Sequence, residues 1–235
     1  MSSAPPSGRI AALVPAAGKG ERLGPGVPKA LREIAGTPML VHAVKALAAS
    51  PMVEVVIVAA PETSVDEVRA LLARQEFSAD VSVVAGGDSR SESVARALIA
   101  LPDDVDVVLV HDAARPLVPV EVVTGVASAV RDGHDAVIPV IPVVDTIKAL
   151  NDVGQILGTV PREQLRATQT PQGFRREVLQ HAHAQVDSPV TDDAGMVESL
   201  GITVHAIAGH EEAFKVTTPL DFLLAESLIA KRRVR

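Results

Sequence analysis

The segment IAALVPAAGKGERLG, residues 10–24, decides the fold because a strand-like apolar run leads directly into a glycine-rich loop. Residues Ile10–Pro15 are apolar throughout, which is typical of a strand covered on both faces of a parallel sheet. The small residues after Pro15 allow backbone N–H groups to approach a phosphate closely. The segment therefore predicts an α/β protein whose first strand ends at an anion-binding loop.

The strand-like pattern recurs along the chain and alternates with segments of helical period. Five further short apolar runs are expected to be strands: Val53–Ala60, Val81–Ala85, Val105–Val110, Ala136–Val140 and Ile202–Ala208. Helix starts are predicted at Thr37-Pro38, at the capping boxes Ser64-x-x-Glu67 and Ser89-x-x-Glu92, and at Thr218-Pro219. This alternation predicts a doubly wound, mostly parallel, Rossmann-like sheet with right-handed crossovers.

Two of the predicted helices carry more detailed expectations. Thr37 is expected to cap its helix, with Pro38 at the first helical position. In the last helix, four leucines recur at helical spacing and are expected to face inward: Leu220, Leu223, Leu224 and Leu228.

One segment interrupts the alternation. Thr146–Leu150 and Gln155–Val160 flank the turn residues Asn151–Gly154, which is the pattern of a β-hairpin. We therefore expect a protruding hairpin arm at about residues 141–161, within one domain spanning 9–235 that follows a flexible N-terminus, 1–8. Arms of this kind commonly pair with a second copy, so we expect a homodimer.

The composition excludes several classes of protein. Of 235 residues, 22 are basic and 29 acidic, so the net charge is 22 − 29 = −7, and there are 4 Phe but no Trp or Tyr. An acidic chain with few aromatic side chains for base stacking argues against a nucleic-acid partner. The lack of cysteine rules out disulfides and thiolate metal sites. Because no apolar run approaches the ~20 residues that span a bilayer, and no signal core follows Met1, we expect a cytoplasmic protein without membrane contact.

Three interpretations compete for the glycine-rich loop. A dinucleotide-binding fingerprint is disfavoured because Leu23 stands at its third glycine and no acidic residue follows the strand ending at Ala60. A P-loop is disfavoured because Gly18-Lys19-Gly20 lacks the hydroxyl that holds magnesium. A nucleotidyltransferase loop fits better, since Arg22 and Lys29 could point at a triphosphate. A tight strand-to-helix turn with solvated cations is the structural alternative.

Two later loops also follow predicted strands, where ligands of open α/β sheets bind. Gly87 lies at a helix start that could bind an anion or a base edge, and a simple capped helix is the alternative. Asp112 is placed to hold Mg²⁺ and Arg115 to bind phosphate, with a surface Asp–Arg pair as the alternative. We expect His111 to be a structural histidine, and Thr191-Asp192-Asp193 to cap a helix.

Together these motifs resemble those of the 2-C-methyl-D-erythritol 4-phosphate cytidylyltransferase family, of the methylerythritol phosphate isoprenoid pathway. The motifs in order are P-A-A-G-x-G-x-R from Pro15, P-K from Pro28, G-G-x-x-R from Gly86, H-D-A-A-R-P from His111, D-T-x-K from Asp145, T-x-T-P-Q from Thr168, T-D-D from Thr191 and K-V-T from Lys215. The match extends from about Ile10 to Leu228, nearly the whole chain. The resemblance implies that the sheet is a nucleotidyltransferase sheet.

The resemblance also implies the site residues. Catalytic roles fall on Arg22, Lys29, Arg162 and Lys215. CTP is expected to contact Ala16, Ala17, Gly18, Gly20, Gly87, Asp88 and Ser93. The polyol phosphate is expected to contact Arg115, Thr146 and Thr170. Arg162 is expected to position this substrate, and Thr146 to reach it in the neighbouring subunit, which implies an active site shared across a dimer. Mg²⁺ is the implied cofactor, with Asp112 as a ligand and Glu212 as a weaker candidate.

The implied reaction joins CTP and 2-C-methyl-D-erythritol 4-phosphate into 4-diphosphocytidyl-2-C-methyl-D-erythritol, with release of pyrophosphate. No protein nucleophile is required, because the attacking phosphate oxygen is already ionised near neutral pH. Three alternatives stay open: a cytidylyltransferase for another polyol phosphate such as ribitol 5-phosphate, a non-catalytic nucleotide-binding module and, less favoured, a dinucleotide-dependent reductase.

Overall fold

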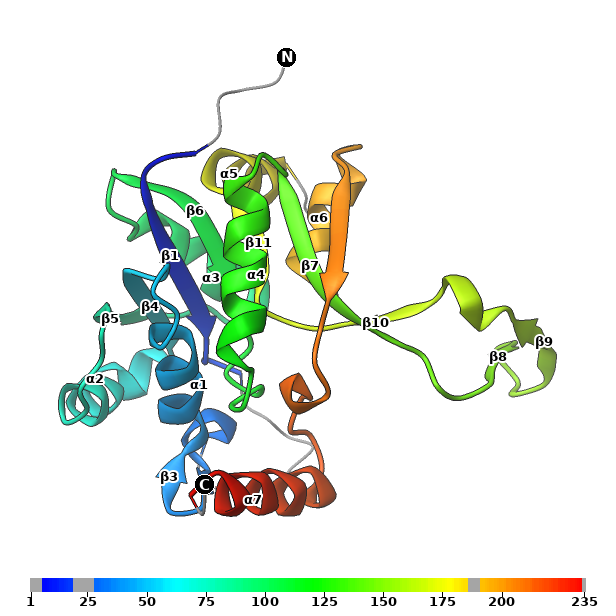
Figure 1. Cartoon of the computed structure of the whole chain (residues 1–235), viewed down its shortest axis with the longest axis horizontal. Coiled ribbons are helices and arrows are strands. Elements are labelled where there is room, and N and C mark those ends of the chain that lie inside the picture. Colours follow the sequence, from blue (N-terminus) through cyan, green and yellow to red (C-terminus); the bar gives the residue numbers. More distant parts are fainter. Residues whose placement is uncertain (1–5, 19–27, 186–190, 234–235) are drawn as a thin grey trace.

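The computed structural model describes residues 6–18, 28–185 and 191–233, and within them the central sheet has eight strands (Figure 1). β7 has β12 on one side and both β10 and β11 on the other, and the sheet continues from β11 through β6, β1 and β4 to β5. The strands are β1 (Arg9–Pro15), β4 (Val55–Ala60), β5 (Asp80–Ala85), β6 (Val105–Val110), β7 (Ala136–Pro142), β10 (Arg166–Thr168), β11 (Gln172–Arg175) and β12 (Val204–Ala208). Only β10 and β11 run antiparallel to their neighbours, so the predicted mostly parallel sheet is confirmed.

Helices cover both faces of this sheet. One face carries α1 (Met39–Ala48), α2 (Val65–Ala73) and α4 (Val120–Arg131), and the other carries α3 (Arg90–Ile99), α5 (Arg176–Gln185) and α6 (Asp193–Ser199). Side chains of β1 alternate between the two layers: Ala12 and Val14 pack toward the first face, and Ala11 and Leu13 toward the second. The predicted doubly wound arrangement is therefore confirmed.

Predicted and observed strands differ in one informative place. All six apolar runs form strands whose ends lie within two residues of the prediction. The pattern does not predict β11, which is buried between β6 and β7, because Gln172 and Arg175 interrupt its apolar character. A strand can thus be buried on both faces without an apolar sequence when its polar side chains have hydrogen-bond or ion-pair partners.

Two predicted helix caps need correction. Ser89 caps α3 as expected and accepts a hydrogen bond from Glu92 N–H at 3.0 Å. Ser64 makes no such bond before α2, because it belongs to a 3₁₀ turn (Glu62–Ser64) rather than to extended backbone. Thr37 is not a cap either: Thr37–Pro38 forms the short strand β3, which pairs with β2 (Glu33–Ile34), and α1 begins only after Pro38.

The last helix, α7 (Pro219–Arg233), contradicts part of the inward-leucine prediction. Leu220, Leu223 and Leu224 are 73%, 64% and 49% exposed. The covered face of α7 instead includes Ala225, Leu228 and Ile229, which pack in one cluster with Ile34, Met39, Leu117 and Val216. Because α7 lies across one end of the molecule, only one stripe of it is covered, and helical period alone does not say which.

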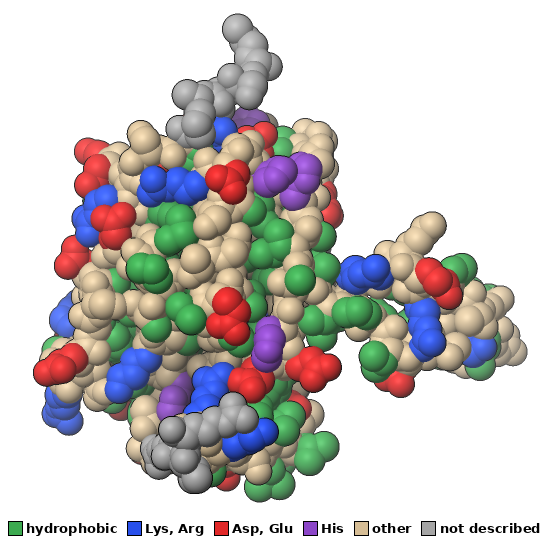
Figure 2. Space-filling view, viewed as in Figure 1, with side chains coloured by type: hydrophobic (Ala, Val, Ile, Leu, Met, Phe, Trp, Pro, Cys, Tyr) green, Lys and Arg blue, Asp and Glu red, His purple; other side chains and the backbone are tan. Residues whose placement is uncertain are grey.

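The predicted arm is confirmed. β8 (Ile147–Leu150) and β9 (Ile156–Val160) form an antiparallel hairpin that stands clear of the body, with charged and hydrophobic side chains over its surface (Figure 2). The chain leaves the sheet through β7 and returns beside it through β10, with Arg166 opposite Pro142. No helix in the described ranges is long and apolar enough to cross a membrane.

Of the predicted flexible N-terminus, residues 1–5 lie outside the described part. Ser7 and Gly8 are described, and their N–H groups donate to the Asp106 carboxylate.

Candidate active site

A cleft of about 310 Å³ opens at the carboxyl edge of the sheet, where the chain leaves β1, β5 and β6. This is the edge at which open α/β sheets bind ligands. Nine of the predicted site residues line it: Ala16, Ala17, Gly18, Lys29, Gly87, Asp88, Ser93, Asp112 and Lys215. Segments far apart in sequence therefore meet as predicted, although Gly20 and Arg22 lie outside the described residues.

The loops after β1 and β5 pack directly against each other. A Cβ at Gly86 would lie 2.7 Å from the Cβ of Ala17 and 2.9 Å from Ser93 Oγ, so only glycine fits there. Ser93 Oγ accepts a hydrogen bond from Gly87 N–H at 3.1 Å and donates to Ser89 O at 2.8 Å. Ser93 therefore shapes the loop wall of the cleft as well as lining it.

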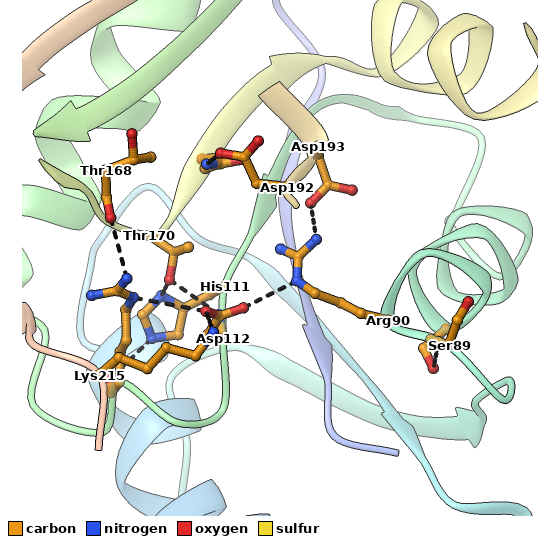
Figure 3. Close-up of polar contacts among 12 residues, drawn as sticks. Ser89, Arg90, His111, Asp112, Thr168, Thr170, Asp192, Asp193 and Lys215 are labelled. Carbon is orange, nitrogen blue, oxygen red and sulfur yellow. Dashed lines mark hydrogen bonds and ion pairs between the residues drawn. The ribbon is translucent and has the colours of Figure 1, made fainter. Parts of the chain in front are cut away.

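Asp112 is the centre of a cluster of cations. Its Oδ1 is 3.1 Å from Arg90 Nε, and its Oδ2 is 2.8 Å from Lys215 Nζ and 3.8 Å from Arg115 Nε (Figure 3). Burial raises the pKa of Asp112, but the charges of Arg90 and Lys215 outweigh that effect and hold its pKa well below the usual range. The carboxylate is thus ionised at neutral pH, and the cations around it outnumber it.

His111 is a structural histidine, as predicted. It is fully buried, and burial lowers its pKa to about 4, so the ring is neutral. Because the carbonyl of Arg115 can only accept, His111 Nε2–H donates to it at 3.0 Å, and Nδ1 accepts from the Thr170 hydroxyl at 3.0 Å. The same hydroxyl accepts from Asp112 N–H at 3.1 Å, so Thr170 supports the loop that carries Asp112.

Besides Thr170, four other predicted residues do not line the cleft. Arg115 lies behind Asp112 and donates to the carbonyls of Ala213 (2.7 Å) and Thr168 (3.2 Å). Glu212 pairs with Arg232. Thr146 and Arg162 lie exposed on the arm and at its base. Their roles stay predictions.

Sequence reasoning assigned no site role to two residues that the fold brings close to the cleft, Arg90 and Asp193. Arg90, the first residue of α3, lines the cleft and pairs with both Asp112 and Asp193. Asp193 is fully buried, whereas Asp192 is the predicted cap and accepts from Gly195 N–H at 3.0 Å. The available signals were the position of Arg90 in G-G-x-x-R at a helix start and that of Asp193 in the T-D-D motif.

A doubly wound sheet with small-residue loops and a cation-lined cleft at its carboxyl edge defines an α/β nucleotide-binding protein of the nucleotidyltransferase type. The family model described as IspD, 2-C-methyl-D-erythritol 4-phosphate cytidylyltransferase, matches residues 10–231. The chain belongs to this family.

Individual relatives agree with this assignment. The chain is 58% identical to 2-C-methyl-D-erythritol 4-phosphate cytidylyltransferase of Frankia casuarinae over 225 residues, covering 96% of this chain and 83% of that protein. It is 54% identical to the enzyme of the same name from Streptomyces avermitilis, covering 97% and 95% of the two chains. The crystal structure of the cytidylyltransferase from Thermus thermophilus superposes with a TM-score of 0.76 at 35% identity, covering 94% of this chain and 99% of that one.

Proposed function

We propose that this protein transfers a cytidylyl group from CTP to 2-C-methyl-D-erythritol 4-phosphate, a step of non-mevalonate isoprenoid precursor synthesis. The observation that carries the proposal is the cation-lined cleft, in which Lys29, Arg90 and Lys215 lie along the same walls as Gly87 and Asp88. Such a site suits two polyanionic reactants. The names of the relatives supply the substrates.

The chemistry needs positioning and charge stabilisation rather than a protein nucleophile. A phosphate oxygen of the polyol attacks the α-phosphorus of CTP, a new P–O bond forms, and the bond to the β-phosphate breaks as pyrophosphate leaves. Two like charges ~4 Å apart repel by about 4 kcal/mol at an effective dielectric near 20. Cationic side chains lower this barrier by stabilising the charge that develops in the transition state.

We assign the roles accordingly. Arg22 and Lys29 bind the triphosphate, while Lys215 and Arg162 orient the attacking phosphate. The cytidine part of CTP lies along the two small-residue loops, at Ala16, Ala17, Gly18, Gly20, Gly87, Asp88 and Ser93. Thr146 completes the polyol phosphate site, and Arg115 and Thr170 support it from behind the cleft lining.

Mg²⁺ is the proposed cofactor, and the donor set of the cleft fits it. Asp88 and Asp112 are the carboxylates that line the cleft, and the described residues contain no group of three or more His, Asp or Glu able to hold a metal. Mg²⁺ commonly takes one or two protein carboxylates together with substrate phosphates. Asp112 would hold the ion, which would neutralise phosphate charge when bound. Chelation with EDTA should abolish pyrophosphate release, and restored Mg²⁺ should recover it.

We also propose a homodimer with shared active sites. In one chain, Thr146 and Arg162 belong to the exposed arm, away from the cleft lining. The arm and its base also expose apolar side chains, at Val144, Leu150, Val153, Ile156 and Leu157. Pairing with a second copy would cover this surface and bring these polar residues to the partner's cleft. A cytoplasmic location stays a prediction from the sequence.

The decisive experiment is incubation with CTP, Mg²⁺ and either 2-C-methyl-D-erythritol 4-phosphate or ribitol 5-phosphate, with mass detection of the cytidine diphosphate product. We expect product and pyrophosphate from the first acceptor, at a rate well above that with the second. Preference for ribitol 5-phosphate would favour the alternative substrate, and CTP binding without product would favour a non-catalytic module.

A further inference from the structure

A buried ion pair lies directly behind the cleft. Asp193 in α6 is fully buried and does not line the cleft. Its Oδ2 is 2.6 Å from Arg90 Nη1 in α3 (Figure 3). Its Oδ1 is 3.0 Å from His183 Nε2 in α5. One carboxylate thus joins the three helices that cover this face of the sheet.

Stability alone explains this arrangement poorly. A charge removed from water carries a large desolvation penalty, and apolar side chains of similar volume often stabilise a fold equally well. Burial raises the pKa of Asp193, yet the hydrogen bond from His183 and the charge of Arg90 outweigh it and lower that pKa. The carboxylate therefore stays ionised inside the helical layer, and each of its oxygens accepts a hydrogen bond, one from Arg90 and the other from His183.

The partner that reaches the cleft is Arg90. Its guanidinium bridges two carboxylates through different nitrogens, with Nη1 on Asp193 and Nε on Asp112. A planar guanidinium held at two points has little freedom to rotate. Held in this way, Arg90 keeps a positive charge beside Gly87 and Asp88, in the part of the cleft assigned to CTP.

We propose that Asp193, anchored by His183, is a positioning residue that fixes Arg90 at the cleft wall, and that Arg90 is a further CTP-binding cation. The inference rests on the proposed function and deepens it. It predicts that Asp193 acts on CTP binding only through Arg90, and that the polyol phosphate site is little affected.

A double-mutant cycle tests this. Asp193→Asn and Arg90→Gln are each expected to raise the Kd for CTP with Mg²⁺, measured by calorimetry, by about 10-fold or more, whereas the double variant should match Arg90→Gln within about 2-fold. The KM for 2-C-methyl-D-erythritol 4-phosphate should change by less than about 2-fold in all three. Wild-type CTP affinity in Asp193→Asn, or an equally large effect of Asp193→Asn with and without Arg90, would overturn the proposal.

Two further variants separate positioning from folding. His183 contacts Asp193 but does not line the cleft. His183→Ala should therefore weaken CTP binding selectively, and it provides a test even if Asp193→Asn fails to fold. Normal CTP affinity in His183→Ala would refute the inference. Asp135→Asn is the matched control, because it removes an ion pair to the buried Arg175 away from the cleft and should leave CTP affinity unchanged. If the wild type itself neither binds nor turns over CTP, the proposed function fails instead.

Discussion

The cleft and the arm hold their polar side chains in opposite ways. In the cleft, Asp112 is 8% exposed and meets cations from α3, from the loop after β6 and from the segment before α7. On the arm, Thr146 is exposed, and Arg162 donates to the backbone of Val144 at the arm's own base. The sheet thus fixes the cleft within one chain, whereas the arm leaves Thr146 and Arg162 exposed to solvent in a single chain.

This contrast suggests a division of labour. On the proposed assignment, the nucleotide contacts lie on loops at the sheet edge, where contacts from several elements fix each side chain. The proposed acceptor contacts are divided between the cleft and an arm that is exposed in a single chain. Substitutions in the cleft, on the arm and in α7 can test this contrast.

Lys29→Ala should lower the rate of pyrophosphate release by about 100-fold or more, because a cation at the triphosphate stabilises charge in the transition state. The unfolding midpoint should stay near that of the wild type. Lys45→Ala, on the exposed side of α1, is the matched control and should retain full activity. A near-normal rate for Lys29→Ala would remove this residue from the catalytic machinery.

Arg162→Ala should lower turnover by about 10-fold or more, and mixing it with inactive Lys29→Ala should restore activity. Random exchange of subunits places half of the molecules in mixed dimers with one intact site each, so about a quarter of the wild-type rate is expected. Activity assays after subunit exchange measure this. No recovery, despite exchange demonstrated by native mass spectrometry, would show that each chain supplies its own arm residues.

Asp221→Asn should destabilise the protein by about 1 kcal/mol at pH 7 without altering CTP affinity, as expected for loss of a charged cap. The Asp221 carboxylate accepts from Thr217 N–H and Thr218 N–H, both at 2.7 Å, just after Lys215. Burial raises the pKa of Asp221, but these hydrogen bonds together outweigh that effect and lower the pKa.

The stabilisation that the Asp221 carboxylate provides depends on pH. Because the folded-state pKa lies below the unfolded value of about 3.9, the stabilisation is complete above that value and is lost as the pH falls through the folded pKa. Denaturant unfolding at several pH values should show the wild type and Asp221→Asn converging in acid. A gap that widens in acid would contradict the assignment.

Leu223→Gln should change the free energy of unfolding by less than about 0.5 kcal/mol, because this side chain is 64% exposed. Ile229→Ala on the covered face of α7 should instead cost about 2 kcal/mol or more. Sizing by light scattering completes the test: a monomeric Leu223→Gln variant would show that α7, rather than the arm, holds two copies together.

Sequence reasoning succeeded where local pattern carries the information. Apolar runs such as Val55–Ala60 are buried throughout, and the hairpin turn at Asn151–Gly154 has a strong local signature. It failed where neighbours decide the outcome. The exposed side of α7 and the polar strand β11 depend on what packs against them, which no single segment contains.

The candidate site shows the same limit. Loop residues such as Gly87 and Asp112 could be placed because parallel strands end at one edge of a sheet. Asp193 could not, since it lies 103 positions from Arg90 in the chain and its character depends on that contact. A buried carboxylate is indistinguishable in sequence from one that merely caps a helix.

The arm begins and ends at a short antiparallel ladder between β7 and β10. In this ladder the paired residues are Val140 with Thr168, Ile141 with Ala167 and Pro142 with Arg166. Beyond this ladder the arm is a closed loop, and the entropic cost of closing a loop grows only slowly with its length. Changes in the length or the surface of the arm are therefore expected to disturb the cleft little.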